Sequence, residues 1–268
     1  LMLAKPEQIV EGVAILMKAI NVSKAVIGIE NNKPDAIATL SRVASGYLGI
    51  EVQPLKVRYP QGGEKQLIDA IIRRQVASGA LPISTGAVVQ NVATAYAVYE
   101  AVQKNKPLVE RVMTVTGKSL KNPGNFLVRL GTPVANLIEA AGGLPEDSGK
   151  VILGGPMMGR AAVSLSSPVG KGTSGVLIIP ESEATRKKEE PCIRCAKCVS
   201  ACPMGLEPYL LAKVSSLNML DRAEKENIMD CIECGCCTFT CPANRPLLDY
   251  VRIGKSQVGA IIRSRAKK

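Results

Sequence analysis

The fold of the C-terminal region is decided by one stretch of sequence, Cys192-Ile-Arg-Cys195-Ala-Lys-Cys198-Val-Ser-Ala-Cys202-Pro203. The same pattern, C-x₂-C-x₂-C-x₃-C-P, returns without a gap as Cys231-Ile-Glu-Cys234-Gly-Cys-Cys237-Thr-Phe-Thr-Cys241-Pro242. Thiolates are soft ligands, and three of them at two-residue spacing suit a cubane iron–sulfur cluster. The doubled pattern therefore predicts two [4Fe–4S] clusters and an electron-transfer role.

In a pair of such motifs, the fourth cysteine of each motif ligates the cluster of the other. We therefore expect cluster 1 and cluster 2 to have crossed ligands. The predicted ligands are Cys192, Cys195, Cys198 and Cys241 for cluster 1, and Cys231, Cys234, Cys237 and Cys202 for cluster 2.

Other uses of the cysteines fit less well. Structural zinc usually takes two separated Cys-x₂₋₄-Cys pairs, and disulfides are typical of secreted chains rather than of tight cysteine clusters. The ninth cysteine, Cys236, fits a small buried thiol, although its position beside Cys237 would let it substitute as a ligand. Histidine is absent, which excludes histidine bases, Rieske centres and histidine-ligated haem.

The net charge of +11 suggests a nucleic-acid partner, but its distribution argues against one. Six basic residues and no acidic residue lie in 252–268, and the chain has two Phe and no Trp for base stacking. We predict a basic C-terminal tail over 251–268. It is either a solvated surface or a dock for an acidic partner.

The first hundred residues read as an α/β domain. Apolar spacing predicts helices over 7–20, 35–44 and 90–102, with a further helix after Gly62-Gly63. Short apolar runs predict strands over 24–30 and 51–59. This alternation favours a doubly wound layer in a domain spanning 1–105.

The pattern changes after residue 105. Predicted strands over 109–116, 126–130, 151–153 and 176–179, with a helix from Thr132 to Ala141, suggest a β-grasp-like domain over 106–180. The charged segment 181–190 reads as a linker into a cysteine-rich domain over 181–250. The predicted fold class is multidomain, α/β plus α+β. No apolar run is long enough to span a membrane.

These motifs, in this order, resemble the C subunit of the Rnf electron-transport complex. The resemblance covers nearly the whole chain. It rests on Tyr59-Pro-Gln-Gly-Gly-Glu-Lys65, Val88-Val-Gln-Asn-Val-Ala-Thr94, Gly154-Gly-Pro-Met-Met-Gly159, Lys171-Gly-Thr-Ser-Gly175 and the two cysteine motifs. It implies a complex-I-flavoprotein-like α/β domain that binds FMN, a soluble-ligand-binding β-grasp (SLBB) domain and a helical dicluster ferredoxin domain.

The resemblance also implies a function. Members of that family are peripheral subunits of a membrane-bound ferredoxin:NAD oxidoreductase, on the cytoplasmic face of the bacterial inner membrane. It passes electrons between NAD(H) and ferredoxin, and its membrane partners link this to ion transport. The implied flavin-contact residues are Tyr59, Gly62, Gly63, Glu64, Gln90, Asn91 and Thr94. A Gly-Gly turn at a helix start can also present amides to an anion, although Gly62-Gly63 alone also fits a tight turn.

The resemblance leaves the flavin pocket in question. The glycine-rich loop that cradles FMN in the family lies upstream of every segment matched here, so we expect an incomplete pocket in this chain. Three alternatives stay open. One is a cobalamin-reductase-type flavin and iron–sulfur protein, one is a flavin-free iron–sulfur connector, and one is a zinc-stabilised binding module.

Overall fold

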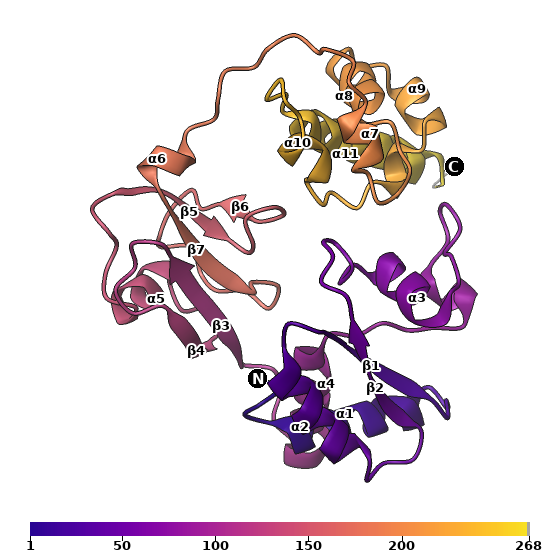
Figure 1. Cartoon of the computed structure of the whole chain (residues 1–268), viewed down its shortest axis with the longest axis vertical. Coiled ribbons are helices and arrows are strands. Elements are labelled where there is room, and N and C mark those ends of the chain that lie inside the picture. The colour runs from indigo at the N-terminus through magenta and orange to yellow at the C-terminus, as the bar shows by residue number, and fades with distance from the viewer. Residues whose placement is uncertain (267–268) are drawn as a thin grey trace. The chain divides into compact units, whose positions relative to one another are not determined.

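The computed structural model describes residues 1–266, and these divide into two compact units that we describe separately (Figure 1). The first unit comprises Leu1–Met113, Asn125–Pro133 and Pro168–Gly172. The second holds the remaining described residues.

The first unit begins with a mixed helix and strand region. Its elements are α1 (Pro6–Ala19), β1 (Ala25–Glu30), α2 (Pro34–Ala44), β2 (Ile50–Leu55), α3 (Glu64–Ile72), a 3₁₀ turn (Pro82–Thr85) and α4 (Val92–Lys104). Proline occupies the first position of both α1 and α2, where its missing N–H costs no helical hydrogen bond. The order of these elements agrees with the predicted alternation of helix and strand.

Strands β1 and β2 pair in parallel, with Ala25 opposite Ile50 and Glu30 opposite Leu55. Helix α2 connects them, so the three elements form one βαβ unit. Its core is made of Val10, Ile27, Ile29, Ala36, Leu40, Ala44 and Ile50. The predicted α/β character is confirmed. The predicted strand 51–59 instead ends at Leu55, where β1 also ends and no further residue of β1 is available for pairing.

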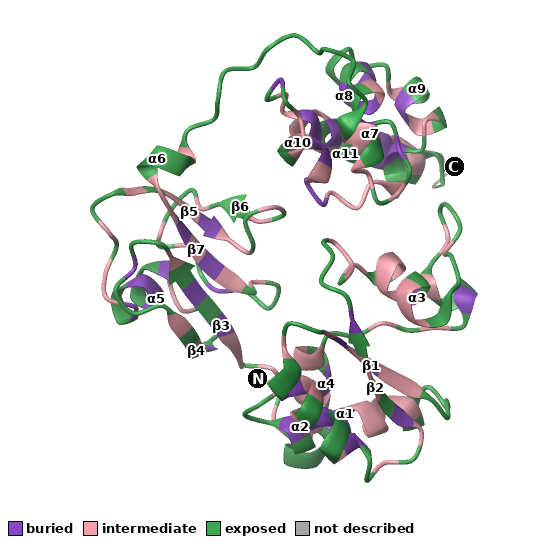
Figure 2. Ribbon diagram, viewed as in Figure 1, coloured by how far each residue is buried: buried purple, intermediate pink, exposed green. Residues whose placement is uncertain are grey.

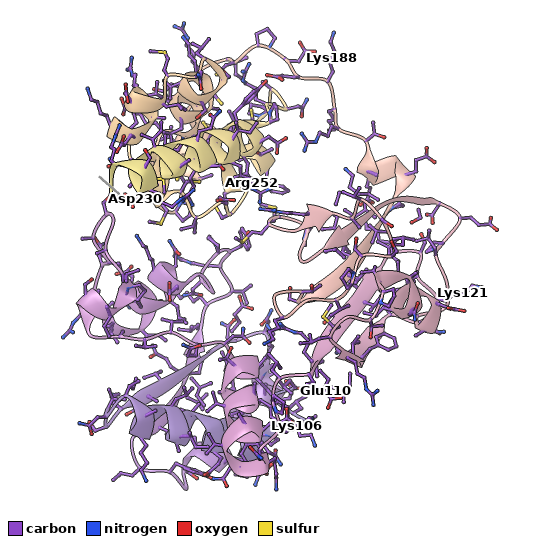
Figure 3. All side chains as sticks on the ribbon, turned by 180° about the vertical axis from the view of Figure 1, so that it is seen from behind. Lys106, Glu110, Lys121, Lys188, Asp230 and Arg252 are labelled. Carbon is purple, nitrogen blue, oxygen red and sulfur yellow. The ribbon has the colours of Figure 1, made fainter. Side chains whose placement is uncertain are left out.

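The α4 helix leads into the next domain through a cluster of charged side chains, labelled in part in Figure 3. The Lys106 ammonium lies 2.9 Å from the Glu100 carboxylate on α4 and 2.5 Å from the Glu110 carboxylate at the start of β3 (Glu110–Gly117). These two acids raise the pKa of Lys106 well above its ordinary value. The ion pairs therefore tie the end of the helix to the start of the strand.

A five-stranded sheet with the order β4-β3-β7-β5-β6 forms the β-grasp part of the chain. Its other elements are β4 (Gly124–Arg129), α5 (Val134–Ala140), β5 (Ser148–Leu153), β6 (Arg160–Ala161) and β7 (Gly175–Pro180). Strand β7 pairs in parallel with β3 and antiparallel with β5. Met113, Val115, Val176 and Ile178 alternate along β3 and β7 as buried residues, so the sheet has one covered face (Figure 2).

The cysteine-rich region is helical. Its elements are α6 (Glu181–Ala184), α7 (Lys197–Ser200), α8 (Pro208–Ser216), α9 (Leu220–Lys225), a 3₁₀ turn (Ile228–Asp230), α10 (Cys236–Phe239) and α11 (Leu247–Arg265). The predicted linker 181–190 thus begins with one short helix. The helical fold predicted for this domain is confirmed.

The segment predicted as a basic tail is different in the structure. From Arg252 to Arg265 it is the body of α11, which packs against α8 and α9. Val251 and Val258 are 2% and 1% exposed. Their spacing of seven residues places them on one helix face. This part of the chain is therefore a packed helix rather than a tail. Lys267 and Lys268 lie outside the described residues.

Candidate functional site

The two cysteine motifs fold as two copies of the same loop. Arg194 and Ala196 in the first loop have φ of 57°, and Glu233 and Gly235 at the matching positions have φ of 58° and 84°. Such left-handed residues turn successive backbone N–H groups toward one concave side, which is a common way to hold an iron–sulfur cluster. In the second loop the Glu233 N–H already donates to Sγ of Cys231 at 3.4 Å. Each loop then enters a one-turn helix, α7 or α10.

The surroundings of the thiols associate cysteines from opposite motifs. Burial raises the pKa of the Cys198 thiol, and the charge of Cys241 adds to that rise. Burial likewise raises the pKa of the Cys231 thiol, with added contributions from Cys202 and Cys234. Each of these cross-motif pairs is one that crossed ligation requires, and they support the proposed ligand sets.

A pocket in the cysteine-rich domain brings the proposed cluster 2 ligands together. Cys202, Cys231, Cys234 and Cys237 all line it. Cys236 lines it too. The remaining lining is apolar, and includes Leu206, Leu211, Leu248 and Val251. Four thiols facing one apolar cavity fit an iron–sulfur cluster, because its sulfur-rich surface is poorly solvated and its charge is shared among thiolates.

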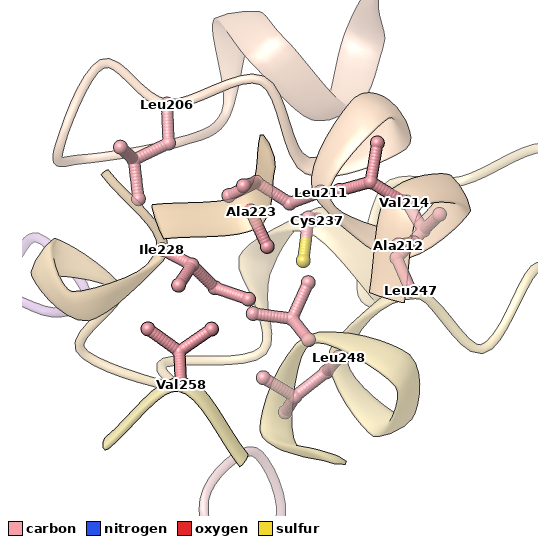
Figure 4. Close-up of a cluster of buried hydrophobic side chains, with 11 residues drawn as sticks. Leu206, Leu211, Ala212, Val214, Ala223, Ile228, Cys237, Leu247, Leu248 and Val258 are labelled. Carbon is pink, nitrogen blue, oxygen red and sulfur yellow. The ribbon is translucent and has the colours of Figure 1, made fainter. Parts of the chain in front are cut away.

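The hydrophobic core of this domain is continuous with the cysteines, as Figure 4 shows for Cys237. Cys198, Cys202, Cys231 and Cys241 pack against the same cluster of buried side chains. Cys192 and Cys195 are exposed. Cluster 2 would therefore lie in an apolar interior, while cluster 1 would have two of its ligands at the surface of the described domain.

Two thiols of the second motif, Cys236 and Cys237, have raised pKa values. Burial raises the pKa of Cys237 to about 11, against an opposing hydrogen bond from Thr238. Burial also raises the pKa of Cys236 to about 11, with a further rise from its hydrogen bond to Cys234. Iron must displace the proton of Cys237 when cluster 2 is assembled, because the thiolate is the ligand.

The number of motif cysteines matches the ligands of two cubane clusters. In residues 1–266, no three cysteine or acidic side chains converge closely enough to hold one ion. A [4Fe–4S] cluster takes one thiolate on each iron, so its ligands stand apart around a larger group. Eight cysteines in two sets of four match that need.

The sequence pattern did not predict that three charged residues would form a group beside the second motif. The Glu233 carboxylate accepts from Arg252 at 3.1 Å and from Lys255 at 3.3 Å. Lys255 also donates to the Cys231 carbonyl at 2.6 Å. The available signal was the excess of basic residues after Arg252, but its pairing with Glu233 depends on how α11 packs.

The first predicted flavin segment lies at the start of α3. Gly63 is the N-cap residue, and Glu64 opens the helix. The Gly63 N–H donates to the Pro60 carbonyl at 2.7 Å. This bond closes a tight turn, which is the structure that Gly62-Gly63 predicts without a ligand. A Cβ on Gly62 would meet no atom within 4 Å, and Tyr59 is 52% exposed. The backbone here is thus open on one side.

The second predicted flavin segment lies at the start of α4. Asn91 is the N-cap, and its side-chain oxygen accepts from the Ala93 N–H at 2.9 Å. Its amide NH₂ stays able to donate, while Gln90 and Thr94 are exposed. Both segments therefore place polar groups at helix N-termini, and groups of this type can bind a phosphate. Their assignment to FMN stays a proposal.

Three domain families match the chain in the order predicted. Residues 1–100 match the Nuo51 FMN-binding domain, residues 112–161 the SLBB domain, and residues 184–242 the 4Fe-4S dicluster domain. The matches fit FMN and two [4Fe–4S] clusters as cofactors.

Similar proteins cover almost all of the chain. It is 44% identical, over 96% of its length, to the C subunit of the proton-translocating ferredoxin:NAD(+) oxidoreductase complex of Clostridium ljungdahlii. It is 44% identical, again over 96%, to the C subunit of the Na(+)-translocating ferredoxin:NAD(+) oxidoreductase complex of Acetobacterium woodii. The chain spans 56% and 58% of these relatives, so it matches little more than half of each.

A solved structure shares the fold. NAD+-reducing [NiFe]-hydrogenase in the H2-reduced state matches with a TM-score of 0.60 and 18% identity. The match covers 95% of this chain and 52% of that chain. At this identity the likeness concerns the fold.

The fold and the paired cysteine loops define a class: a dicluster iron–sulfur protein on a complex-I-type flavoprotein scaffold with an SLBB domain. Within that class, the chain is similar over 96–100% of its length to C subunits of ion-translocating (Rnf-type) oxidoreductase complexes, which confirms the predicted resemblance. No helix in the described part of the chain is long and apolar enough to cross a membrane.

Proposed function

We propose that this chain is an electron-transfer segment of a membrane-associated ferredoxin:NAD oxidoreductase complex. The observation that carries the proposal is the pair of like-folded cysteine loops, together with the pocket that Cys202 of the first motif shares with Cys231, Cys234 and Cys237 of the second. Crossed ligands bring two clusters close together, and short separation is what fast transfer of single electrons requires. The relatives are subunits of ferredoxin:NAD(+) oxidoreductase complexes, and this supplies the reaction, in which NAD and ferredoxin exchange electrons.

Each part of the chain has a role in this proposal. The eight motif cysteines hold the two clusters, and the buried side chains around Cys237 exclude water from cluster 2. The segments at the starts of α3 and α4 would hold the flavin, with Tyr59, Gly62, Gly63 and Glu64 in one and Gln90, Asn91 and Thr94 in the other. FMN, when bound, converts the two-electron chemistry of NAD(H) into transfer of single electrons.

The proposal extends to location and partners. The complex would lie at the cytoplasmic face of the bacterial inner membrane, with this chain as a peripheral part. Its membrane partners would link electron flow to ion transport, and ferredoxin would be the other redox partner. The support is that the relatives are subunits of ion-translocating ferredoxin:NAD(+) oxidoreductase complexes.

The test is reduction by NADH. The full-length protein is purified anaerobically, supplied with FMN, and mixed with NADH while the visible absorption of the clusters is followed. We expect NADH to bleach the clusters when FMN is present and to leave them oxidised when FMN is omitted. Bleaching by dithionite, with none by NADH in the presence of FMN, would contradict the flavoenzyme function and favour the flavin-free connector.

A further inference from the structure

The two cysteine loops differ in charge at one equivalent position. Arg194 and Glu233 each follow the first cysteine of their motif by two residues and have nearly the same left-handed backbone. The second motif thus carries an acid where the first carries a base. An anion next to a cluster disfavours reduction, because each reduction adds negative charge.

The acid in the second loop is neutralised by α11. The Glu233 carboxylate lies 3.1 Å from Nε of Arg252 and 3.3 Å from Nζ of Lys255, with one oxygen facing each cation. Arg252 and Lys255 are three residues apart, so they project from the same face of the helix. Figure 3 labels Arg252 on α11. All three side chains are between 23% and 30% exposed, so water screens them less than fully exposed charges.

The lysine also contacts the ligand loop itself. Nζ of Lys255 donates to the backbone carbonyl of Cys231 at 2.6 Å. The positive charge of Lys255 therefore lies beside the backbone of a proposed cluster 2 ligand.

We propose that Arg252 and Lys255 are positioning residues that hold the second cysteine loop through Glu233 and set the reduction potential of cluster 2. The inference rests on the proposed ligation of cluster 2. The three charges together leave one net positive charge beside the loop, which favours the reduced cluster. Removing Lys255 would leave Glu233 and Arg252 balanced, and removing Glu233 would leave two positive charges.

The two single variants should therefore move the potential in opposite directions. Lys255→Met should shift the one-electron equilibrium of cluster 2 toward the oxidised form by about threefold to tenfold, where tenfold corresponds to about 59 mV. Glu233→Gln, which keeps the size of the side chain, should shift it toward the reduced form. The double variant should return close to the unmodified potential, because it restores the net charge.

Matched controls separate charge from structure. Lys255→Arg keeps the charge and should keep the potential. Arg263→Met removes a positive charge from the same helix, eight residues or roughly 12 Å along the axis from Lys255, and should leave cluster 2 unchanged. A merely structural role for Lys255 would not make Glu233→Gln and Lys255→Met act in opposite directions.

The experiment is an anaerobic redox titration of both clusters, followed by electron paramagnetic resonance, after counting iron in each variant. Opposite shifts confined to cluster 2 would support the inference. Eight irons with unmoved potentials, or shifts of the same sign in both single variants, would overturn it. Fewer than eight irons in the unmodified protein would instead contradict the dicluster function on which it rests, so the two failures are distinguishable.

Discussion

At the scale of single residues, the eight motif cysteines differ in their surroundings despite their equal spacing. Cys234 and Cys237 are buried, whereas Cys202 and Cys231 are half-buried at the edge of the same pocket. Replacing Cys237 removes packing as well as a thiolate, because it belongs to the domain core. Ligation is therefore tested more cleanly at Cys202 and Cys231.

Crossed ligation gives a specific prediction for a double variant. If Cys202 and Cys231 hold the same cluster, Cys202→Ala with Cys231→Ala should lose that cluster and retain about four irons per chain. Pairing Cys202→Ala with Cys195→Ala should damage both clusters and retain close to none. Iron analysis after anaerobic purification measures the outcome.

The matched control is Cys236→Ala, which removes a neighbouring thiol that lies outside both proposed ligand sets. It should retain about eight irons. The opposite pattern in the double variants, with no iron in the first and about four in the second, would show that each motif ligates its own cluster.

Sequence spacing predicts candidate ligands that lie within one motif. It does not predict ion-pair partners that come close only when helices pack. The cysteines follow from C-x₂-C-x₂-C-x₃-C-P because the turn geometry is local. Glu233 and Lys255 are 22 residues apart, and they meet because α11 folds back along the second loop. The flavin segments depended on the family resemblance, since a Gly-Gly turn and an Asn N-cap also occur without a ligand.

At the scale of elements, α1 and α4 approach each other closely at a glycine. A Cβ on Gly12 would lie 1.9 Å from the backbone oxygen of Ala95, so the two helices would have to move apart. Gly12→Ala gains about 1 kcal/mol of helix propensity. The overpacking outweighs this gain, and we expect a net loss of about 1–2 kcal/mol in the free energy of unfolding.

Urea denaturation of the two proteins measures this difference. Gly46→Ala is the control, because its Cβ would be 3.5 Å from the Val43 carbonyl, an ordinary contact. It should leave the free energy of unfolding unchanged or slightly higher. Equal stabilities for Gly12→Ala and the unmodified protein would show that the helices do not pack as closely as described.

Helices with a regular apolar face were predictable, and helices dominated by charge were not. The helix predicted over 7–20 agrees with α1 to within one residue at each end, because Ile9, Val10 and Val13 follow a helical period. In α11 the buried residues Val251, Gly254 and Val258 follow a similar period, but the surrounding bases suggested a tail. The end of β2 was mispredicted because pairing with β1, rather than local preference, sets its length.

At the scale of the whole molecule, the cysteine-rich domain has a small core that its cysteines complete. Cys237 is part of that core, and four other motif cysteines pack against it. Removal of iron should therefore unfold α8 to α11 while the five-stranded sheet persists, because metal binding and folding are coupled in such domains.

Anaerobic chelation of iron, followed by circular dichroism and limited proteolysis, tests this coupling. We expect loss of helical signal and new cleavage within 190–250, with the region 110–180 protected. Unchanged helical signal after complete iron loss would show that the apolar core is sufficient to hold this domain.

The most direct test of the central claim is to count iron and acid-labile sulfide in the anaerobically purified protein. We predict about eight of each per chain, with a visible absorption that dithionite bleaches. Extractable FMN in the same sample would support the proposed flavin site. A colourless protein that contains zinc in place of iron would contradict the electron-transfer function.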